Sequence, residues 1–212
     1  MKCPAFWKHQ KGFSTIELMI ALTVTTAFAA SFYGAFQVMN NGMWSAKVYF
    51  DTNNSVKGAM DRMARDVEEA IQVETSHTFN GTVENTGTGC LILRLPSIDN
   101  AGIPTSISAQ FDYVMYKLNA VDSTLRRSVD ILDGTSQRNS GADVNSTVVA
   151  KKVIALVFCN PANNDTVLTQ EAAGTITAMK YLNAQITAQG KTLHQNESTT
   201  VDSDMMLRNK IN

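Results

Sequence analysis

The sequence predicts an α+β protein in which a long N-terminal helix, membrane-spanning in its first half, packs in its second half on a C-terminal antiparallel β-sheet domain. Three observations support this prediction: an uncharged stretch over residues 18–46, an apolar stripe at helical spacing over residues 48–70, and short β-rich runs after residue 73. The expected parts are a basic segment at 1–12, the membrane half of the helix at 13–36, its amphipathic half at 37–73 and a globular domain at 74–212.

Composition indicates a folded protein. Of the 212 residues, 44% are apolar and 17% are charged, which is too apolar for a disordered chain. The formal net charge is −1, and the only short basic clusters are Arg126 with Arg127 and Lys151 with Lys152. We expect these four side chains to lie at solvated strand ends, and we predict no nucleic-acid partner because a phosphate-binding protein usually carries a basic face.

The uncharged stretch predicts one membrane span. Residues 18–46 contain no Asp, Glu, Lys or Arg, and residues 18–36 are apolar enough to cross a hydrocarbon core of about 30 Å as a helix. The preceding segment carries three lysines and no acid. Positive charge on that side predicts a cytoplasmic N-terminus and a translocated C-terminal domain.

An ordinary secretory signal peptide is the competing interpretation of this segment. Ala27, Phe28 and Ala29 form a small-x-small cleavage site after an apolar run. This interpretation leaves Glu17 unexplained, because a carboxylate costs about 2.5–3.5 kcal/mol at the centre of a span and somewhat less near its end. Glu17 therefore favours a functional role for this end of the helix.

The motif KGFSTIEL at residues 11–18 resembles the cleavage and methylation site of type IV pilins and pseudopilins. The resemblance implies a leader at 1–12 and a membrane aspartyl peptidase that cuts between Gly12 and Phe13. It also implies that the same enzyme methylates the new amine of Phe13. Glu17, at the fifth mature position, is then expected to pair with the N-terminal ammonium of a neighbouring subunit in a low-dielectric helix bundle.

A narrower resemblance, to the pseudopilin J and pilin W group of minor subunits, is carried by residues 63–70, 114–118, 125–127 and 206–209. It implies a minor pilin or pseudopilin of a type IV pilus or type II secretion filament that acts in assembly initiation or in the tip complex. The implied partners are other pilin or pseudopilin subunits, the prepilin peptidase and, before assembly, inner-membrane lipid. The implied location is the bacterial inner membrane with a periplasmic C-terminal domain, and the filament after assembly.

Several alternatives stay open at this point. The machine is a secretion system, a retractile pilus or a competence apparatus, because all three share this type of N-terminus. A tip adhesin or DNA-uptake subunit would use the loop at residues 130–146 as its binding surface. A periplasmic domain with an unrelated signal anchor is the third class, and it predicts cleavage after Ala29 or none.

The periodicity predicts one helix from about residue 14 to residue 73, with the second half lying against the protein's own sheet. Gly190 is expected at a hairpin turn, and residues 114–118 and 123–127 are expected to form another hairpin. Residues 130–146 and 160–174 are expected to be loops. Candidate strands lie at residues 77–83, 90–95, 107–118, 124–129, 148–158, 176–187 and 199–207.

Two cysteines lie in the predicted translocated domain. Cys90 and Cys159 are a candidate disulfide, because an oxidising compartment permits the bond and a loop of this length would contribute about 4 kcal/mol in the chain-entropy model. Two unpaired buried cysteines are the alternative. Cys3 lies in the leader and would be removed with it.

No metal, cofactor or catalytic motif is predicted. His77 and His194 have no second ligand at metal-binding spacing, and Asp130, Asp133 and Asp143 do not follow a known calcium-loop pattern. The chain also lacks the Gly-x-Ser-x-Gly, Walker, His-Glu-x-x-His and Cys-x-x-Cys motifs. We therefore expect an interaction protein and not an enzyme.

Overall fold

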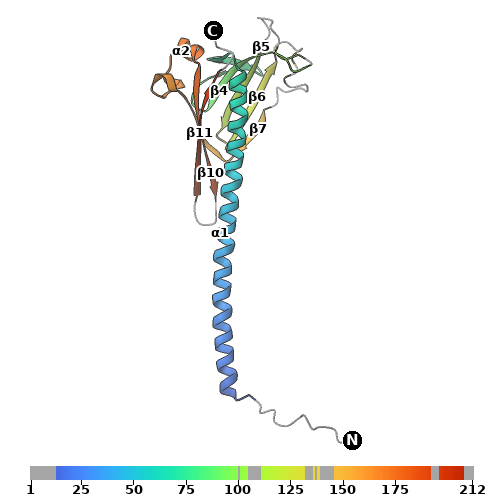
Figure 1. Ribbon diagram of the computed structural model, residues 1–212, viewed down its shortest axis with the longest axis vertical. Coiled ribbons are helices and arrows are strands. Elements are labelled where there is room, and N and C mark those ends of the chain that lie inside the picture. The colour runs from blue at the N-terminus through green and yellow to red at the C-terminus, as the bar shows by residue number, and fades with distance from the viewer. Residues whose placement is uncertain are drawn as a thin grey trace. The chain divides into compact units, whose positions relative to one another are not determined.

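The computed structural model describes residues 13–99, 101–104, 111–131, 136, 138, 146–191 and 196–207. The chain divides into two compact units, Met1–Ala46 and Lys47–Asn212. Helix α1 (Thr15–Glu69) supplies the described part of the first unit and the beginning of the second (Figure 1). Residues 1–12, which the sequence assigns to the leader, lie outside the described residues.

After α1, the described residues of the second unit form eleven strands, two short 3-10 helices and one short α-helix. In chain order they are β1 (Gln72–Glu74), β2 (Ser76–Phe79), β3 (Thr82–Asn85), β4 (Cys90–Pro96), β5 (Phe111–Asn119), β6 (Thr124–Ile131), β7 (Thr147–Lys151), β8 (Val153–Asn160), η1 (Pro161–Asn163), β9 (Thr166–Val167), η2 (Leu168–Gln170), α2 (Ala173–Ala178), β10 (Tyr181–Lys191) and β11 (Asn196–Met206).

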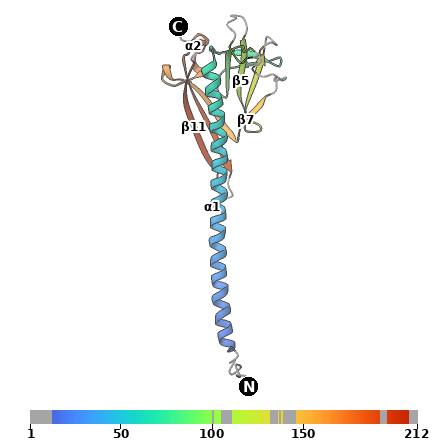
Figure 2. The same ribbon diagram turned by 45° about the vertical axis from the view of Figure 1, so that its right-hand side comes forward.

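The strands form two antiparallel sheets and a separate hairpin. One sheet has the order β1-β4-β5-β6-β7, the other has the order β11-β10-β8-β9, and β2 pairs with β3. In Figures 1 and 2 the two sheets lie on either side of the second half of α1. The α+β class with an antiparallel β domain is therefore confirmed, but the expectation of a single sheet is wrong.

The second half of α1 packs on the core that these sheets enclose. Its buried side chains recur at spacings of three and four, as predicted, and they share one cluster with Leu93 of β4, Val114 of β5, Leu156 of β8 and Ile186 of β10. The buried residues of α1 are Thr52, Val56, Ala59, Met60, Met63, Asp66 and Val67. The helix is thus the layer that both sheets share.

The helix ends four residues earlier than expected. Residues 72 and 73, predicted to belong to its last turn, lie instead in β1, which pairs with residues 92–94 of β4. The backbone N–H of Ile71 donates to the carbonyl of Arg94 in β4 at 2.8 Å. This bond to a strand replaces the bond that a continuing helix would form. Val73 is buried in this sheet.

Two of the predicted strands are interrupted by residues with positive φ. Residues 77–83 fold back as the β2–β3 hairpin around Asn80 and Gly81, whose φ angles are 52° and 78°. Such a pair of positive φ angles suits an Asn-Gly turn. Residues 148–158 divide into β7 and β8 at Lys152, where φ is 62°. At Asn80 and Gly81 the chain turns back so that β3 pairs with β2, and at Lys152 it passes from β7, which pairs with β6, to β8, which pairs with β10.

The remaining predicted elements are partly confirmed. β4, the β5–β6 hairpin and β11 lie where the sequence places them, although residues 107–110 are outside the described residues. The strand predicted at residues 176–187 is wrong at its start, because Ala173–Ala178 forms α2 and the strand, β10, begins at Tyr181. The expected loop at 160–174 contains η1, β9, η2 and the start of α2.

Gly190 does not make a turn. It lies inside β10 and pairs with Glu197. A Cβ atom at this position would lie 2.6 Å from Cγ1 of Val48 and 3.2 Å from Oγ1 of Thr52, both on α1. The glycine therefore serves close packing of the helix on the strand, which is one reason that a glycine occurs within a strand.

Candidate functional site

The first turn of α1 positions the only charged side chain of the stretch from residue 13 to residue 46. Ser14 precedes the helix, and Glu17 is the third residue inside it. The Glu17 carboxylate accepts a hydrogen bond from the backbone N–H of Ser14 at 3.0 Å. This is the glutamate half of a capping box, in which a carboxylate satisfies an N–H group that the helix leaves unpaired.

The position of Glu17 is also electrostatically favourable. The unsatisfied N–H groups at a helix N-terminus give it a partial positive charge, so a carboxylate in the first turn is stabilised. Glu17 remains exposed while it accepts the Ser14 N–H. A carboxylate has more acceptor sites than this one bond uses, so Glu17 can also accept from a cation outside the chain.

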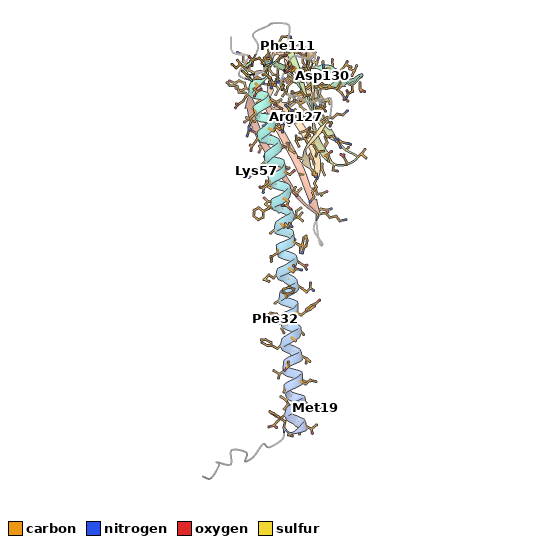
Figure 3. The ribbon with its side chains drawn as sticks, turned by 90° about the vertical axis from the view of Figure 1, so that its right-hand side faces the viewer. Met19, Phe32, Lys57, Phe111, Arg127 and Asp130 are labelled. Atoms are coloured by element: carbon orange, nitrogen blue, oxygen red, sulfur yellow. The ribbon has the colours of Figure 1, made fainter. Side chains whose placement is uncertain are left out.

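The side chains that follow form a large exposed apolar surface. Phe13 is 86% exposed, Phe28 76% and Val38 74%, and Figure 3 shows Met19 and Phe32 projecting from α1. The other large apolar side chains exposed before residue 46 are Ile16, Leu18, Met19, Ile20, Leu22, Val24, Phe32, Tyr33, Phe36, Met39, Met43 and Trp44. A soluble monomer rarely exposes so much contiguous apolar surface.

The polar side chains within this stretch do not interrupt its apolar character. The hydroxyls of Thr25 and Ser31 donate to the carbonyls of Ala21 at 2.7 Å and of Ala27 at 2.9 Å, and Thr23 and Thr26 make similar bonds. Polar groups that enter hydrocarbon must be satisfied within the protein. Among the described residues, α1 is the one helix long and apolar enough to cross a membrane.

Two of the predicted site residues, Phe13 and Glu17, can be placed at this end of the chain. Phe13 is exposed immediately before the helix, and Glu17 lies one turn further on. Gly12, on the other side of the predicted cleavage point, lies outside the described residues. Phe13 is largely exposed, so no described residue covers it.

The candidate disulfide is absent from the structure, where both cysteines are free. Cys90 lies on the outer face of the five-stranded sheet, in a small cluster with Phe79, Ile92 and Met115. Cys159 belongs to the other sheet, on the strand face opposite the buried Phe158. Alternation along each strand thus directs the two thiols away from the shared core and from each other.

The two thiols differ in their surroundings. Burial, reinforced by the Glu84 carboxylate, raises the pKa of Cys90 from 9.0 to about 12, although Lys117 acts in the opposite direction. Partial burial and Asp165 raise the pKa of Cys159. Neither thiol is activated as a nucleophile, because a reactive cysteine needs a lowered pKa.

Arg127 is the basic side chain that sequence reasoning placed wrongly. Instead of lying at a solvated strand end, it is buried in β6. Its guanidinium donates two hydrogen bonds to Asp66 of α1, from Nε to Oδ2 at 2.7 Å and from Nη2 to Oδ1 at 3.2 Å. The Tyr116 hydroxyl also donates to Oδ2 of Asp66 at 2.6 Å. This bidentate pair, labelled at Arg127 in Figure 3, ties the end of the helix to the sheet.

The pKa shifts follow from this enclosure. Burial raises the pKa of Tyr116, and the Asp66 charge raises it further. Burial alone would lower the pKa of Arg127, but its hydrogen bonds to Asp66 and the charge of that carboxylate outweigh this effect and raise it. Arg127 therefore stays charged, which suits a structural clamp better than acid-base chemistry.

A second arginine, Arg138, lies in the expected loop at residues 130–146 and is anchored to the rest of the domain. The guanidinium of Arg138 donates to Glu69 at 2.5 Å, to Asp112 at 3.1 Å and to the carbonyl of Pro96 at 2.8 Å. Ser136 donates to the same Asp112 carboxylate at 2.6 Å. The expectation of a solvated loop is therefore wrong at Ser136 and Arg138.

His77 also has a structural role. Its ring stacks on Tyr113 at 3.8 Å between centroids, and its Nε2 lies 2.8 Å from Oδ2 of Asp130. These contacts hold the β2–β3 hairpin over the outer face of β5. His194, Asp133 and Asp143, the other side chains considered for metal binding, lie outside the described residues, and no group of three described His, Cys, Asp or Glu side chains could hold a metal ion.

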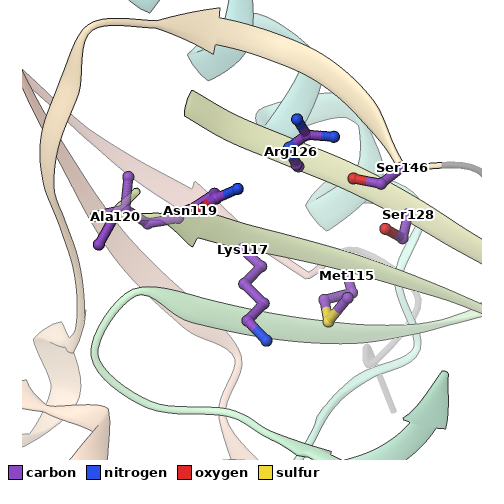
Figure 4. Close-up of a pocket in the computed structure, with 8 residues that line it drawn as sticks. Met115, Lys117, Asn119, Ala120, Arg126, Ser128 and Ser146 are labelled. Carbon is purple, nitrogen blue, oxygen red and sulfur yellow. The ribbon is translucent and has the colours of Figure 1, made fainter. Parts of the chain in front are cut away.

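One depression of about 380 Å³ lies on the outer face of the five-stranded sheet, lined by Lys117 and Asn119 of β5 and by Arg126 and Ser128 of β6 (Figure 4). Lys117 and Arg126 face each other across the strands. Lys117 is paired with Glu84 at 2.6 Å and Arg126 with Asp122 at 2.9 Å, so the two charges are already balanced. The depression therefore does not have the character of an anion site.

No protein-family model, curated protein or solved structure matches the chain.

Proposed function

We propose that the chain is a minor pilin or pseudopilin, a subunit that assembles through the exposed half of α1 into a type IV pilus or a type II secretion filament. One observation carries the proposal: a single carboxylate, Glu17, lies in the first turn of a helix whose next 29 residues, 18–46, are uncharged and, apart from the half-buried Asn41 and Ser45, exposed. Such a surface requires a lipid or protein environment, and its lone charge requires a cation there.

The motif at residues 11–18 indicates that the cation is the N-terminal ammonium of a processed neighbouring subunit. Hydrolysis of the peptide bond between Gly12 and Phe13 would remove three lysines and create an ammonium group at Phe13. Before the cut, the lysines hold this end of the helix at the cytoplasmic surface of the inner membrane. After it, the new ammonium of one subunit pairs with Glu17 of its neighbour, and methylation of the amine leaves that charge in place.

The second unit would then lie on the periplasmic side and contact related subunits. Arg127 and Arg138 hold it to the end of α1 through Asp66 and Glu69, which suits a part that must follow the helix out of the membrane. The role is structural, with no chemistry assigned to the protein itself. Assembly initiation or the tip complex is the proposed place, by the resemblance to the minor-subunit group.

The adhesin or DNA-uptake alternative has less support. Its binding surface would be the loop at residues 130–146, where Ser136 and Arg138 are turned to the protein's own Asp112. The other described residues of that loop are at its ends. No described contact favours an external ligand there.

The decisive experiment determines the mass and the N-terminal sequence of the protein from cells with and without the prepilin peptidase. An N-methylated Phe13 that disappears without the enzyme supports the proposal. A mature start at Ala30, or an intact Met1 in both strains, excludes it and favours a periplasmic domain with a signal sequence.

Two variants separate processing from assembly. Gly12→Val should block cleavage, whereas Glu17→Gln should be cleaved normally but fail to enter the filament fraction. Ser31→Ala is the matched control, because it changes an exposed polar group on the same helix and leaves the charge in place. Normal filament incorporation of Glu17→Gln would remove the charge pair from the proposal.

A further inference from the structure

The outer edge of β11 is a long strand edge without a described partner. β11 pairs with β10 over eleven consecutive residues, from Asn196 opposite Lys191 to Met206 opposite Tyr181. In the order β11-β10-β8-β9 it is the terminal strand, labelled in Figure 1. Within the described part of the chain, no strand lies against its other side.

The register shows which backbone groups face outward. The N–H of Leu207 donates to the carbonyl of Lys180 at 3.0 Å, and in an antiparallel ladder every second residue makes such bonds. Odd-numbered residues such as Val201 and Ser203 therefore bond to β10. The N–H and C=O groups of the even-numbered residues, Ser198, Thr200, Asp202 and Asp204 among them, point away from the sheet.

This edge lacks three of the features that usually prevent strand addition, namely shortness, a bulge and a proline. Edge strands are commonly short, bulged or interrupted by proline. β11 contains no proline, and its pairing with β10 has no register shift. The other sheet edges differ: β1 has three residues, β9 has two, and the N–H of Lys151 in β7 is already bound to Ser55 of α1.

The charge of β11 selects the kind of partner. The strand carries Glu197, Asp202 and Asp204 and no lysine or arginine. Asp202 and Asp204 are exposed on the outer sheet face, and Asp204 accepts a hydrogen bond from Asn183 at 2.9 Å. Opposite charges across neighbouring strands are stabilising, and like charges are destabilising.

A second copy of β11 fits this edge poorly. Antiparallel pairing with full overlap would place Asp202 opposite Thr200 of the other copy, so the two Asp202 side chains would lie diagonally across the two-fold axis with the Asp204 side chains close by. Four carboxylates would then gather around the axis with no base in either strand. The acids thus disfavour self-pairing and favour a basic strand.

We propose that the outer edge of β11 binds an extended segment of a different protein, with lysine or arginine at alternate positions, by adding it as a fifth strand to this sheet. Backbone bonds to the even-numbered residues supply the affinity, and Asp202 and Asp204 select the basic side chains. This surface is separate from the apolar half of α1, so the inference does not depend on the proposed function.

The test measures amide hydrogen exchange by NMR on the full chain in detergent micelles. The probe is a blocked nine-residue peptide that alternates lysine with threonine and valine. In the free chain, the amides of Ser198, Thr200, Asp202 and Asp204 should exchange much faster than those of Val201 and Ser203. Saturating probe should slow the even-numbered amides at least tenfold, because they acquire hydrogen-bond acceptors.

Matched variants separate the backbone contribution from the charge contribution. Ser198→Pro removes one outward N–H without removing a bond to β10 and should weaken probe binding about tenfold, whereas Ser198→Ala should not. Asp202→Lys should weaken probe binding more than Ser198→Pro does. The affinity of Asp202→Asn for the probe should lie between those of the wild type and Asp202→Lys. A probe with glutamate in place of lysine should not bind.

Other results would overturn the proposal. Protection of the even-numbered amides in the free chain that grows with protein concentration would mean that a second copy covers the edge. Protection independent of concentration would mean that another segment of the same chain covers it. Equal binding of the lysine and glutamate probes, or no protection at millimolar probe, would exclude a basic strand.

Discussion

Asp66 in α1 and Arg127 in β6 form a buried bidentate ion pair between positions 61 residues apart, with Nε to Oδ2 at 2.7 Å. Both charges have left water, so their mutual contact offsets a large desolvation cost. Tyr116 supplies a third bond to the same carboxylate. The pair therefore joins the end of the helix to the sheet.

Removing one partner of this pair should be costly. Asp66→Ala leaves the Arg127 guanidinium buried without its counter-ion, and we expect the free energy of unfolding to fall by about 3–5 kcal/mol. Tyr116→Phe removes one hydrogen bond and should cost about 1–2 kcal/mol. Urea denaturation followed by near-UV circular dichroism measures both.

The control for Asp66→Ala is Asp61→Ala, an exposed acid on the same helix, which should change stability by less than about 0.5 kcal/mol. Similar losses for the two alanine variants would contradict the assignment of Asp66 to a buried clamp.

Arg138 should behave as a second clamp, in contrast with Arg126. Arg138→Met leaves Asp112, which is fully buried, without its cation, so we expect a loss of about 3–5 kcal/mol in unfolding free energy. Arg126→Met breaks an exposed pair with Asp122 and should cost less than about 1 kcal/mol. Thermal and urea unfolding of both variants give the comparison, and equal stabilities would show that Arg138 is not anchored as described.

Gly190 tests the close approach of β10 to α1. Gly190→Ala adds a Cβ that would lie 2.6 Å from Cγ1 of Val48, and we expect it to destabilise the protein by about 1–3 kcal/mol. Val48→Ala removes the opposing methyl groups, so the double variant should recover most of that loss. A double-mutant cycle on unfolding free energies measures the coupling.

Gly58→Ala is the matched glycine control. Nothing lies within 4 Å of the added Cβ there, and alanine favours a helix by up to about 1 kcal/mol, so this change should stabilise. Additive effects of Gly190→Ala and Val48→Ala would show that the two positions do not touch.

Alkaline pH should weaken the fold through Cys90. Its thiol has a pKa of about 12 in the folded protein and 9.0 without the shift, so it stays protonated in the fold at a pH where the unfolded chain already ionises. The associated stability is complete below pH 9 and is lost as the pH rises towards 12. From about pH 8 to about pH 10.5 the loss should be roughly 2 kcal/mol.

The measurement compares urea midpoints at both pH values in wild type, Cys90→Ala and Cys159→Ala. The alkaline loss should shrink in Cys90→Ala and largely persist in Cys159→Ala, because Cys159 is less buried. An unchanged alkaline loss in Cys90→Ala would assign it to other groups.

Local pattern predicted the elements whose partners are near in the chain. The stripe on α1 is confirmed from Thr52 to Val67, and so is the β5–β6 hairpin, because helical spacing and a short connection are properties of neighbouring residues. The Asn80–Gly81 reversal was missed although an Asn-Gly pair is a strong turn signal. Apolar residues on both sides made the two strands resemble one.

Pairing between distant residues was not predictable in this way. Arg127 was expected at a solvated strand end, and no local pattern marks Asp66 or Arg138 as buried, because charged side chains are rarely buried unless they are paired. The partners lie 61 and 26 or more residues away in the chain. The same limit explains why the orientation of the Cys90 and Cys159 thiols could not be predicted, since it depends on which sheet each strand joins.

The amino-acid sequence by itself determined the α+β class, the uncharged stretch that suits a membrane and the place of Glu17 at its start, since each follows from composition and short-range spacing. Only the tertiary structure decided that the described strands form two large sheets and a hairpin, that Gly190 is a packing contact, that Cys90 and Cys159 point apart, and that no described strand covers the outer edge of β11. These depend on which strands become neighbours, and that choice is made by the burial of a shared core and not by any one segment.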